Sequence, residues 1–457
     1  MSSFSNLKLS KQQLDNLNSL GYVVMTPIQE KVLPLSLEGK DIIAKAKTGS
    51  GKTVAFGLPI LAKLQVSKFS PQGLVLCPTR ELANQVATEI RRLARHQQNI
   101  KIVILCGGKS IGTQIASLKY GAHVVIGTPG RIQDHLRKKT LDLREISMVV
   151  LDEADRMLEM GFVDQIKSIV KVTPNSRQTV LFSATYPDNI KRLSSRFQIS
   201  PSVISIEALP DSHQLEQFFF LCAHHEKLSG LKIVLEHYRP ASVLIFCQTK
   251  KTTARVLSYL QDNGIAVKSL HGDLEQRDRD QVLIQFGNRS CRILVATDVA
   301  ARGLDIDKLP MVINFDLPSD AESYVHRIGR TGRSTNHGLA ISLLTDKESY
   351  KLDTIRAFLD RSLDIEVIES LAYVGEIPQS EFITLYISGG RKQKIRPGDV
   401  LGALTSDSRI DAKTIGRIDV TDYATFVAVE RLYVSLALDQ IRNGKIKGRM
   451  FKVRSLL

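Results

Sequence analysis

The sequence predicts an α/β protein with two tandem parallel-sheet lobes followed by a small α+β domain. Three observations lead to this prediction. A glycine-rich turn, Lys45–Thr53, lies between the apolar run Ile42–Ala44 and a second apolar segment, as expected between a buried strand and a helix. The continuously apolar run Ile146–Leu151 ends in the acidic segment Asp152–Asp155, which is typical of a strand covered on both faces of a parallel sheet. The same alternation of strands and helices then restarts in the second half of the chain.

The glycine-rich turn has the composition of a phosphate-binding loop. Its glycines let the backbone curl so that N–H groups point at phosphate oxygens, and the helix start adds a partial positive charge. We expect Lys52 to neutralise the β and γ phosphates of ATP and the Thr53 hydroxyl to bind Mg²⁺. The general pattern has glycine where Ala46 stands, so a glycine-rich surface turn is the alternative interpretation. The expected ATP-binding residues of the loop are Thr48, Gly49, Ser50, Gly51, Lys52 and Thr53.

The acidic segment follows a predicted strand at its carboxyl end, where open α/β sheets bind their ligands. We expect Asp152 to hold Mg²⁺ through water and Glu153 to orient or deprotonate the attacking water. An acidic helix N-cap is the alternative interpretation, since Asp and Glu also favour the first turn of a helix.

The length, net charge and cysteine content of the chain limit the classes of protein to which it can belong. With 457 residues the chain is too long for one core. The 62 Lys+Arg exceed the 47 Asp+Glu by +15, which favours a polyanionic partner. No apolar run reaches the length of a membrane span, and the N-terminus lacks the apolar run of a signal peptide, so we expect a cytosolic protein without a membrane partner. The five cysteines form no CxxC pair, so neither a zinc site nor a disulfide framework is indicated.

The chain divides into segments by pattern. Residues 1–205 form the first predicted lobe, which includes a helix whose apolar face is Leu82, Val86, Ile90 and Leu93. Residues 206–216 form a linker, residues 217–372 a second lobe, and residues 380–457 a third domain. Two pairs of segments show the internal repeat: 73–80 with 242–250, and 122–128 with 291–297. The second lobe lacks a phosphate loop, so we expect it to act on the nucleotide that the first lobe binds.

A basic segment of the second lobe, residues 326–333, offers the groups for this role. Arg330 and Arg333, three apart and flanked by glycines, could stabilise transition-state charge on the γ-phosphate, an effect of roughly 10³ to 10⁵ in rate. His326 belongs to the same segment and is also a candidate catalytic residue. A basic helix C-terminus with a glycine cap is the alternative interpretation.

With these segments in order, the chain resembles the DEAD-box RNA helicases over residues 4 to about 370, which implies two RecA-like lobes and ATP hydrolysis. Residues 21–29, with Phe4 upstream, resemble the family's Q motif, in which Gln29 would contact the adenine edge and Tyr22 would stack on its face. Met25 stands where the family usually has proline. The family's own phosphate-loop motif has alanine at the position of Ala46.

The resemblance also implies which residues bind RNA, couple the sites and complete the nucleotide site. Ser183 and Thr185 match the motif that links hydrolysis to RNA, and Asp155 completes the acidic motif, whereas Gly303 and Asp305 would contact nucleotide. Such motifs grip the RNA backbone without reading bases. The implied RNA-binding residues are Pro78, Thr79, Arg80, Gly108, Thr128, Arg131, Thr249, Gln276, Arg279 and Thr297.

The third domain has the element order βαββαβ, the arrangement of an RNA-recognition motif. The predicted elements are strands at 382–388, 415–420, 423–429 and 449–453 and helices at 396–405 and 431–442. Ile383, Leu385 and Ile387 are expected to face the core, leaving Tyr386 and Phe426 as stacking aromatics. Ala424 stands where a third ring is expected, which argues against base stacking on the sheet.

Residues 380–457 contain 14 Lys+Arg and 8 Asp+Glu, a net charge of +6. The cations gather after Asp439, although a charge run of this kind can also be a solvated face. The candidate RNA-binding cations are Arg442, Lys445, Lys447, Arg449 and Lys452.

A helicase core followed directly by such a domain resembles a bacterial subgroup of the family, which implies a hairpin of 23S ribosomal RNA and pre-50S particles as partners and a role in large-subunit assembly. The expected activity is RNA-dependent ATP hydrolysis with local unwinding of short duplexes, using ATP and Mg²⁺. An ATP-gated RNA clamp is one alternative, and a helicase acting on another structured RNA is a second. A DNA helicase is disfavoured by the RNA-type motif set.

Overall fold

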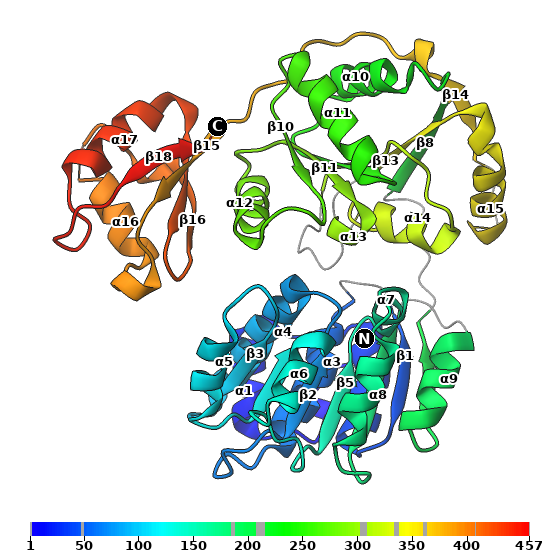
Figure 1. The fold of residues 1–457 in the computed structure, drawn as a ribbon, viewed down its shortest axis with the longest axis vertical. Coiled ribbons are helices and arrows are strands. Elements are labelled where there is room, and N and C mark those ends of the chain that lie inside the picture. The colour runs from blue at the N-terminus through cyan, green and yellow to red at the C-terminus, as the bar shows by residue number, and fades with distance from the viewer. Residues whose placement is uncertain are drawn as a thin grey trace. The chain divides into compact units, whose positions relative to one another are not determined.

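A computed structural model describes residues 2–46, 50–183, 188–206, 215–301, 309–332, 338–359, 363–406 and 408–456. The chain separates into two compact units. The first unit is the N-terminal lobe, and the second contains the C-terminal lobe together with the third domain (Figure 1). Within the described ranges, no helix is both long and apolar enough to cross a membrane.

The first lobe is built on a parallel sheet. Its described residues form seven strands in the order β3-β4-β2-β5-β6-β1-β7. The strands are β1 Ile42–Lys45, β2 Gly73–Leu76, β3 Ile102–Leu105, β4 Val124–Gly127, β5 Met148–Leu151, β6 Gln178–Ser183 and β7 Ser202–Ser205. The helices are η1 Phe4–Asn6, α1 Lys11–Ser19, α2 Pro27–Leu37, α3 Lys52–Lys63, α4 Arg80–Leu93, η2 Ala94–His96, α5 Ile111–Leu118, α6 Pro129–Arg137, α7 Ala154–Glu159, α8 Val163–Lys171 and α9 Asp188–Phe197.

Helices cover both faces of this sheet, which explains why its strands are apolar without alternation (Figure 1). In β5, Met148 and Val150 belong to the apolar cluster under α2, α3 and α4, whereas Val149 and Leu151 belong to the cluster under α6, α7 and α8. The predicted helix after Thr79 is α4, and its predicted apolar face is buried. The strand that leads to the acidic segment is therefore central and buried, as predicted.

The second lobe repeats the first. Its described residues form seven strands in the order β10-β11-β9-β12-β13-β8-β14, which matches the first sheet position by position. The strands are β8 Leu215–Leu221, β9 Val243–Cys247, β10 Val267–Leu270, β11 Ile293–Thr297, β12 Met311–Asn314, β13 Gly338–Leu344 and β14 Ile365–Val367. The helices are α10 Lys227–Tyr238, α11 Lys250–Asp262, α12 Gln276–Gly287, α13 Asp298–Ala301, α14 Ala321–Ile328, η3 Asp346–Glu348, α15 Ser349–Leu359 and η4 Ile368–Ser370.

This order confirms the internal repeat seen in the sequence. The segment pair 73–80 and 242–250 contains β2 and β9, which occupy the same place in the two sheets. The pair 122–128 and 291–297 contains β4 and β11, which are also equivalent. Leu215 and Glu216, which the sequence pattern had assigned to the linker, lie in β8; residues 207–214 lie outside the described residues.

The third domain has the predicted βαββαβ order around a four-stranded antiparallel sheet, with strands arranged β16-β17-β15-β18. Its strands are β15 Phe382–Ile387, β16 Ile415–Val420, β17 Thr425–Glu430 and β18 Val453–Leu456. Its helices are η5 Arg391–Gln393, α16 Pro397–Leu404, η6 Ala412–Thr414, η7 Arg431–Tyr433 and α17 Val434–Asn443. Ile383, Leu385 and Ile387 lie in the core, as predicted.

The prediction of the last strand at 449–453 was wrong, because the strand begins only at Val453. The preceding residues form a turn in which Ile446 bridges Arg449, with Lys447 at φ 51° and Gly448 at φ 74°. Backbone in this left-handed region cannot continue a strand. The predicted helix at 431–442 is divided into η7 and α17.

Candidate functional site

The phosphate loop lies between β1 and α3, as predicted. Lys47, Thr48 and Gly49 lie outside the described residues, but the end of the loop is described. Gly51 is the N-cap of α3 with φ 91°. A Cβ there would lie 2.4 Å from Nε2 of Gln29, so both the backbone conformation and the space require glycine. Thr53 follows in the first turn of α3, where backbone N–H groups are available to an anion.

Lys52 and Asp152 are brought together from two strand ends. The Nζ atom of Lys52 lies 3.8 Å from Oδ1 of Asp152, and both side chains are buried. Burial raises the pKa of Asp152 to about 6, against the opposing effect of the Lys52 charge. Oδ1 of Asp152 is buried without a hydrogen-bond partner. A buried carboxylate oxygen of this kind fits a site that takes a further cation or its water ligands.

The neighbouring acids have distinct local roles. Glu153 is the N-cap of α7 and has φ 54° and ψ 53°, a left-handed conformation that costs a non-glycine residue of order 1 kcal/mol or more. Such strain is common where a side chain must be aimed at a reacting group. Asp155 is buried, and its Oδ1 accepts the N–H of Arg156 at 3.0 Å. These contacts show that the acidic segment is more than a solvent-exposed helix start.

Ser183 ends β6 beside β1. Its backbone oxygen accepts the N–H of Ala46, the residue before the phosphate loop, at 2.9 Å. Its hydroxyl oxygen is buried without a hydrogen-bond partner. Thr185, the other residue of the predicted coupling motif, lies outside the described residues. The described part of that motif is therefore bonded directly to the strand that leads into the phosphate loop.

Gln29, one of the predicted adenine-binding residues, contacts the phosphate loop. Oε1 of Gln29 accepts the N–H of Thr26 at 2.9 Å, and Nε2 of Gln29 donates to the Gly51 oxygen at 3.1 Å. The Thr26 hydroxyl donates to the Ser50 oxygen at 2.8 Å. Thr26 was not among the predicted site residues, although the Thr-x-x-Gln capping pattern that begins α2 is visible in the sequence.

The two aromatic residues of the same motif pack against each other. Phe4 is buried, and its ring lies edge-on to that of Tyr22 with centroids 6.3 Å apart. The Tyr22 hydroxyl donates to Glu89 of α4 at 2.5 Å. Burial and this hydrogen bond raise the pKa of Tyr22 to about 12. Phe4 therefore supports Tyr22 from the core, and Met25 is also part of that core.

The predicted RNA-binding residues of the first lobe meet at one edge of the sheet. Pro78 to Arg80 follow β2, Gly108 follows β3, and Thr128 to Arg131 follow β4, and these three strands are neighbours. A Cβ on Gly108 would lie 1.7 Å from Nη1 of Arg80, so glycine is required for the guanidinium to lie against the backbone. Arg131 donates from Nη1 to the Lys109 oxygen at 3.0 Å. Together these residues offer backbone and cationic groups suited to phosphates.

The predicted RNA-binding residues of the second lobe lie at helix starts and at a strand end. Thr249 is the N-cap of α11, and Thr297 ends β11. Arg279 donates from Nη2 to the Ala300 oxygen at 2.7 Å, and Gln276 donates to Asp280 at 2.8 Å within α12. Gly303, Asp305 and Arg333 lie outside the described residues.

The basic segment begins in the last turn of helix α14, Ala321–Ile328. His326 lies in this turn, and Arg330 follows the end of the helix, both half-buried. Arg327, which was not among the predicted site residues, is almost fully buried and makes a two-bond ion pair with Asp298, at 2.7 Å for each bond. Arg327 also donates to the Asn314 side chain at 3.1 Å. Its position inside the predicted basic segment was the available signal.

In the third domain, the aromatic face of the sheet contacts the second lobe. Tyr386 and Phe426 lie 5.5 Å apart in an edge-on pair. Phe426, Ala424 and Leu456 form an apolar cluster to which Ile284 of α12 adds. The base-stacking rings expected of an RNA-recognition motif are thus in contact with protein side chains in this structure.

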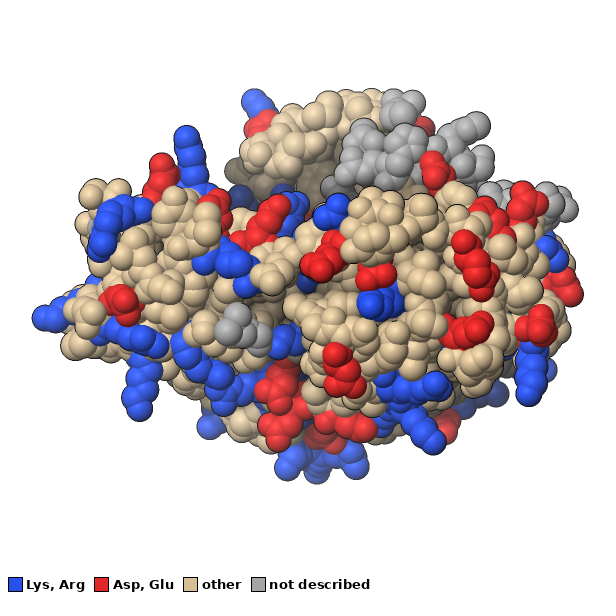
Figure 2. Space-filling model, turned by 90° about the horizontal axis from the view of Figure 1, so that it is seen from above, with Lys and Arg blue, Asp and Glu red and all other residues tan. Residues whose placement is uncertain are grey.

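Polar contacts accompany that apolar cluster. Asn288 donates to the Thr384 hydroxyl at 2.8 Å, and Gln285 donates to the Leu456 oxygen at 3.0 Å. Among the candidate cations, Lys447 pairs with Asp399 at 3.1 Å and Arg442 with Asp439 at 3.7 Å. Figure 2 shows acidic side chains between the basic ones on the face that it draws, so the charge on that face is mixed.

Comparisons with known proteins show to which protein family the chain belongs. Residues 26–193 match the DEAD/DEAH box helicase family, residues 226–335 match the helicase conserved C-terminal domain, and residues 384–455 match the DbpA RNA binding domain. The ATP-dependent RNA helicase DbpA of Escherichia coli is 48% identical over 457 residues, which is 100% of both chains. The protein of the same name from Bacillus subtilis is 39% identical over 99% of both chains.

Among solved structures, S. cerevisiae Dbp5 bound to RNA and ADP BeF3 matches with a TM-score of 0.73 and 31% identity, covering 81% of this chain and 97% of that chain. The two parallel-sheet lobes are therefore RecA-like, as the resemblance implied. The chain belongs to the DEAD-box ATP-dependent RNA helicases, and a DbpA RNA-binding domain follows its two lobes.

Proposed function

We propose that this helicase hydrolyses ATP in an RNA-dependent reaction and separates short RNA duplexes locally, without processive movement, in the cytosol. The observation that supports the ATP site most directly is the buried pair of Lys52 and Asp152, in which one carboxylate oxygen has no hydrogen-bond partner. The pair lies at the carboxyl ends of the strands, the edge where ligands of open α/β sheets bind.

The donor set fits Mg²⁺ and a triphosphate. Thr53 and Asp152 would hold the metal, the latter through water, and Lys52 would contact the phosphates. Bound Mg²⁺-ATP supplies the phosphoanhydride bond that is broken. Glu153 orients the attacking water and accepts its proton. Arg330 and Arg333 stabilise the transition-state charge, with His326 in the same segment. Gly303 and Asp305 would contact the nucleotide.

The test of this activity compares RNA with DNA. ATP hydrolysis by the full chain is measured with single-stranded RNA and with DNA of equal sequence and length, each at saturation. We expect stimulation by RNA only, because the strand-end motifs contact the backbone and the 2′-hydroxyl distinguishes the two polymers. Equal stimulation by both would contradict an RNA-specific reaction. If RNA stimulates hydrolysis but a short labelled duplex stays paired, the ATP-gated clamp is the better description.

For the target, we propose a hairpin of 23S ribosomal RNA within pre-50S particles, so that the helicase acts in large-subunit assembly. The support is the DbpA RNA-binding domain at residues 384–455 and its basic C-terminal run. Within the described residues, Lys445, Arg449 and Lys452 are exposed and form no ion pair, so their charges are available to phosphates.

The test of the target measures binding of the full chain to a set of 23S hairpins and to unrelated hairpins at two salt concentrations. One hairpin should bind more tightly than the rest at both. A variant with Lys445→Gln and Arg449→Gln should bind every hairpin more weakly and lower the salt slope by roughly 0.7 to 0.9 for each phosphate that the protein no longer neutralises. Lys413→Gln, an exposed lysine of the same domain, is the matched control. Equal affinity for all hairpins would contradict the ribosomal target and leave other structured RNAs open.

A further inference from the structure

The second lobe contains a counterpart of the phosphate site. Because the two sheets share one strand order, β8 and α10 correspond to β1 and α3, and β12 corresponds to β5. Helices α3 and α10 both begin with a buried lysine, Lys52 and Lys227 respectively. Each lysine faces an aspartate that follows the equivalent strand: Nζ of Lys52 lies 3.8 Å from Oδ1 of Asp152, and Nζ of Lys227 lies 3.7 Å from Oδ1 of Asp316.

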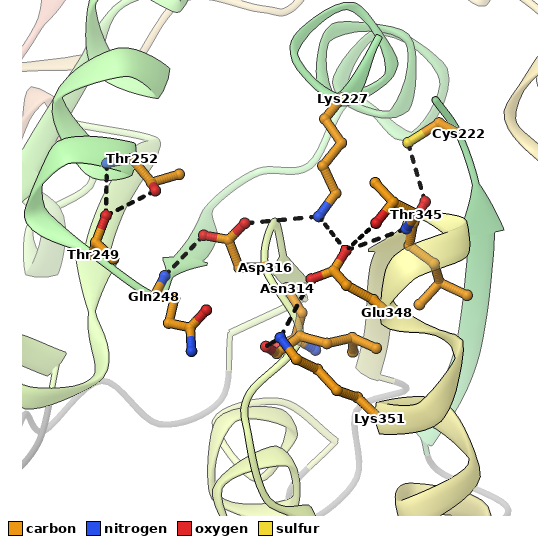
Figure 3. A network of polar contacts seen from close by, with 12 residues as sticks. Cys222, Lys227, Gln248, Thr249, Thr252, Asn314, Asp316, Thr345, Glu348 and Lys351 are labelled. Atoms are coloured by element: carbon orange, nitrogen blue, oxygen red, sulfur yellow. Dashed lines mark hydrogen bonds and ion pairs between the residues drawn. The ribbon is translucent and has the colours of Figure 1, made fainter. Parts of the chain in front are cut away.

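The second lobe differs from the first because one of its own carboxylates, that of Glu348, pairs with the lysine. In the second lobe, Nζ of Lys227 donates to Oε2 of Glu348 at 2.7 Å (Figure 3). Glu348 follows β13, the counterpart of β6, and its Oε2 also accepts from the backbone N–H and the hydroxyl of Thr345, at 3.2 and 3.1 Å. Lys351 approaches its Oε1 at 3.5 Å.

This carboxylate is held in its charged form. Burial would raise the pKa of Glu348, but the hydrogen bond and charge of Lys227, the charge of Lys351 and the hydrogen bond from Thr345 together outweigh burial and lower it. The segment from Cys222 to Glu226 also lacks the glycines that let a phosphate loop curl. A phosphate group would have to displace a half-buried, paired carboxylate, so the second lobe uses its lysine internally.

The ion cluster of Lys227, Glu348 and Asp316 contacts a predicted RNA-binding segment, the turn at Gln248 and Thr249, through Asp316. Oδ2 of Asp316 accepts the backbone N–H of Gln248 at 2.9 Å, on the opposite side from Lys227 (Figure 3). The next residue, Thr249, caps α11 by accepting the N–H of Thr252 at 3.0 Å. The backbone oxygen of Asp316 accepts from the buried Arg327 of α14 at 2.6 Å. One aspartate thus bonds the turn after β9 and the helix of the basic segment.

We propose that Lys227 and Glu348 are positioning residues for RNA binding: they fix the Asp316 carboxylate, which holds the Gln248–Thr249 turn in the conformation that contacts RNA. This inference depends on the proposed RNA contact of Thr249. The Lys227–Asp316 pair, which is the counterpart of the Lys52–Asp152 pair, then supports RNA binding rather than nucleotide binding. Without Lys227, two carboxylates would repel each other across the turn, and the N–H of Gln248 would lose a fixed acceptor.

The experiment measures binding of a fluorescein-labelled single-stranded oligouridylate to the full chain with Mg²⁺ and a non-hydrolysable ATP analogue. Lys227→Met should weaken RNA binding on the order of tenfold, the loss expected for one misplaced charge-assisted contact. The maximal ATPase rate at saturating RNA and the affinity for a fluorescent nucleotide should stay near the original values. Lys227→Arg should restore much of the RNA affinity, because it keeps the charge. Lys232→Met, in the same helix and partly exposed, is the matched control.

A double-mutant cycle with Thr249→Val separates this inference from the proposed function. If Lys227 acts through the turn, Lys227→Met should add little to the loss that Thr249→Val already causes. Additive losses, or unchanged RNA affinity in Lys227→Met, would overturn the positioning role. Unchanged RNA affinity in Thr249→Val would instead contradict the RNA contact itself. If Lys227→Met does not fold, Glu348→Gln gives the same test with an isosteric change, and an unaltered RNA affinity there also overturns the inference.

Discussion

A buried carboxylate with one unpartnered oxygen, beside a single lysine, is the feature of the first lobe that most directly indicates a ligand. Leaving a buried polar atom without a hydrogen bond costs about 1 to 3 kcal/mol, and more for a charged group. Oδ1 of Asp152 has no hydrogen-bond partner among the described residues, and Nζ of Lys52 lies 3.8 Å from it. A metal ion with its water ligands would provide the missing partner. This one residue therefore already indicates a bound cation.

Lys52→Ala should lower the turnover of ATP at saturating ATP and RNA by about a hundredfold or more, because one preorganised positive charge on the transferred group is removed. The measurement is steady-state phosphate release. A thermal unfolding curve serves as the control, since the change also leaves Asp152 without its ion-pair partner. Retained turnover in a folded variant would contradict the phosphate-loop assignment.

Glu153→Gln should stop hydrolysis while leaving nucleotide binding nearly unchanged. The amide has the same shape as the carboxylate but cannot accept a proton. Binding of a fluorescent ATP analogue and single-turnover hydrolysis separate the two effects. A large loss of nucleotide affinity together with full catalytic turnover of the bound fraction would show that Glu153 only caps α7.

The five free cysteines should resist alkylation in the folded chain. Burial raises the pKa of Cys106, Cys222 and Cys291 to about 11, and it also raises the pKa of Cys77 and that of Cys247 well above the usual range of a thiol. Only the thiolate reacts, and a thiol of pKa 11 is roughly one part in a thousand thiolate at pH 8. Iodoacetamide labelling counted by mass should therefore be slow at pH 8 and complete in guanidinium. Rapid labelling of the native chain would show that the core is more open than described.

At the scale of elements, the aromatic face of the third domain's sheet packs on α12 of the second lobe. The contact combines the apolar cluster of Ile284, Ala424, Phe426 and Leu456 with the buried bond from Asn288 to Thr384. A sheet face covered by a helix is not free to stack bases. RNA selectivity of this domain is therefore expected from other surfaces, among them the exposed cations after α17.

Thr384→Val should weaken this contact by about 1 to 3 kcal/mol, because the buried amide of Asn288 loses its acceptor while the side-chain volume is kept. Hydrogen exchange should then become faster in both α12 and β15. Thr425→Val is the matched control: Thr425 is equally buried, but its hydroxyl bonds the Gly389 oxygen inside the domain. Faster exchange in α12 for both variants, or for neither, would contradict a specific role of Thr384 in the contact.

At the scale of the whole molecule, we expect the two lobes to bind the RNA backbone and the third domain to select the RNA. Removal of residues 380–457 should leave an ATPase that responds to RNA but has no preference among RNAs. The truncation keeps Pro378 and Gln379, whose backbone oxygens accept from Arg292 at 3.2 and 3.0 Å, so the end of the second lobe stays anchored.

The measurement compares RNA-stimulated hydrolysis of the truncated and full chains with 23S hairpins and with bulk RNA. Loss of all RNA stimulation would show that the lobes depend on the third domain for RNA binding itself. A truncated chain that still prefers one hairpin would place the selectivity in the lobes. An unchanged response to bulk RNA without any remaining preference is the predicted result.

The sequence by itself determined the three-part architecture, the repeat and most of the nucleotide and RNA motifs. These features are local: an apolar run followed by Asp152, or by Thr79 or Thr297, predicts a strand end, and neighbouring parallel strands bring their ends to one edge. The terminal strand was misplaced because the turn at Lys447 and Gly448 depends on backbone conformation that a basic, apolar pattern does not reveal.

Only the tertiary structure decided which distant partners meet. Lys227 pairs with Asp316 and Glu348, Arg327 pairs with Asp298, and Asn288 bonds Thr384, and in each case the partners lie on different elements. Strand order decides the ion pairs, because it sets which carboxylate follows the strand next to a given helix. The bond from Asn288 to Thr384 depends instead on the packing of the third domain against α12. The periodicity of apolar residues along the chain does not predict the order of the strands in the sheet. The second lobe's lysine, which looks like any other helix-starting residue in the sequence, becomes a counterpart of Lys52 only once the two sheets are aligned.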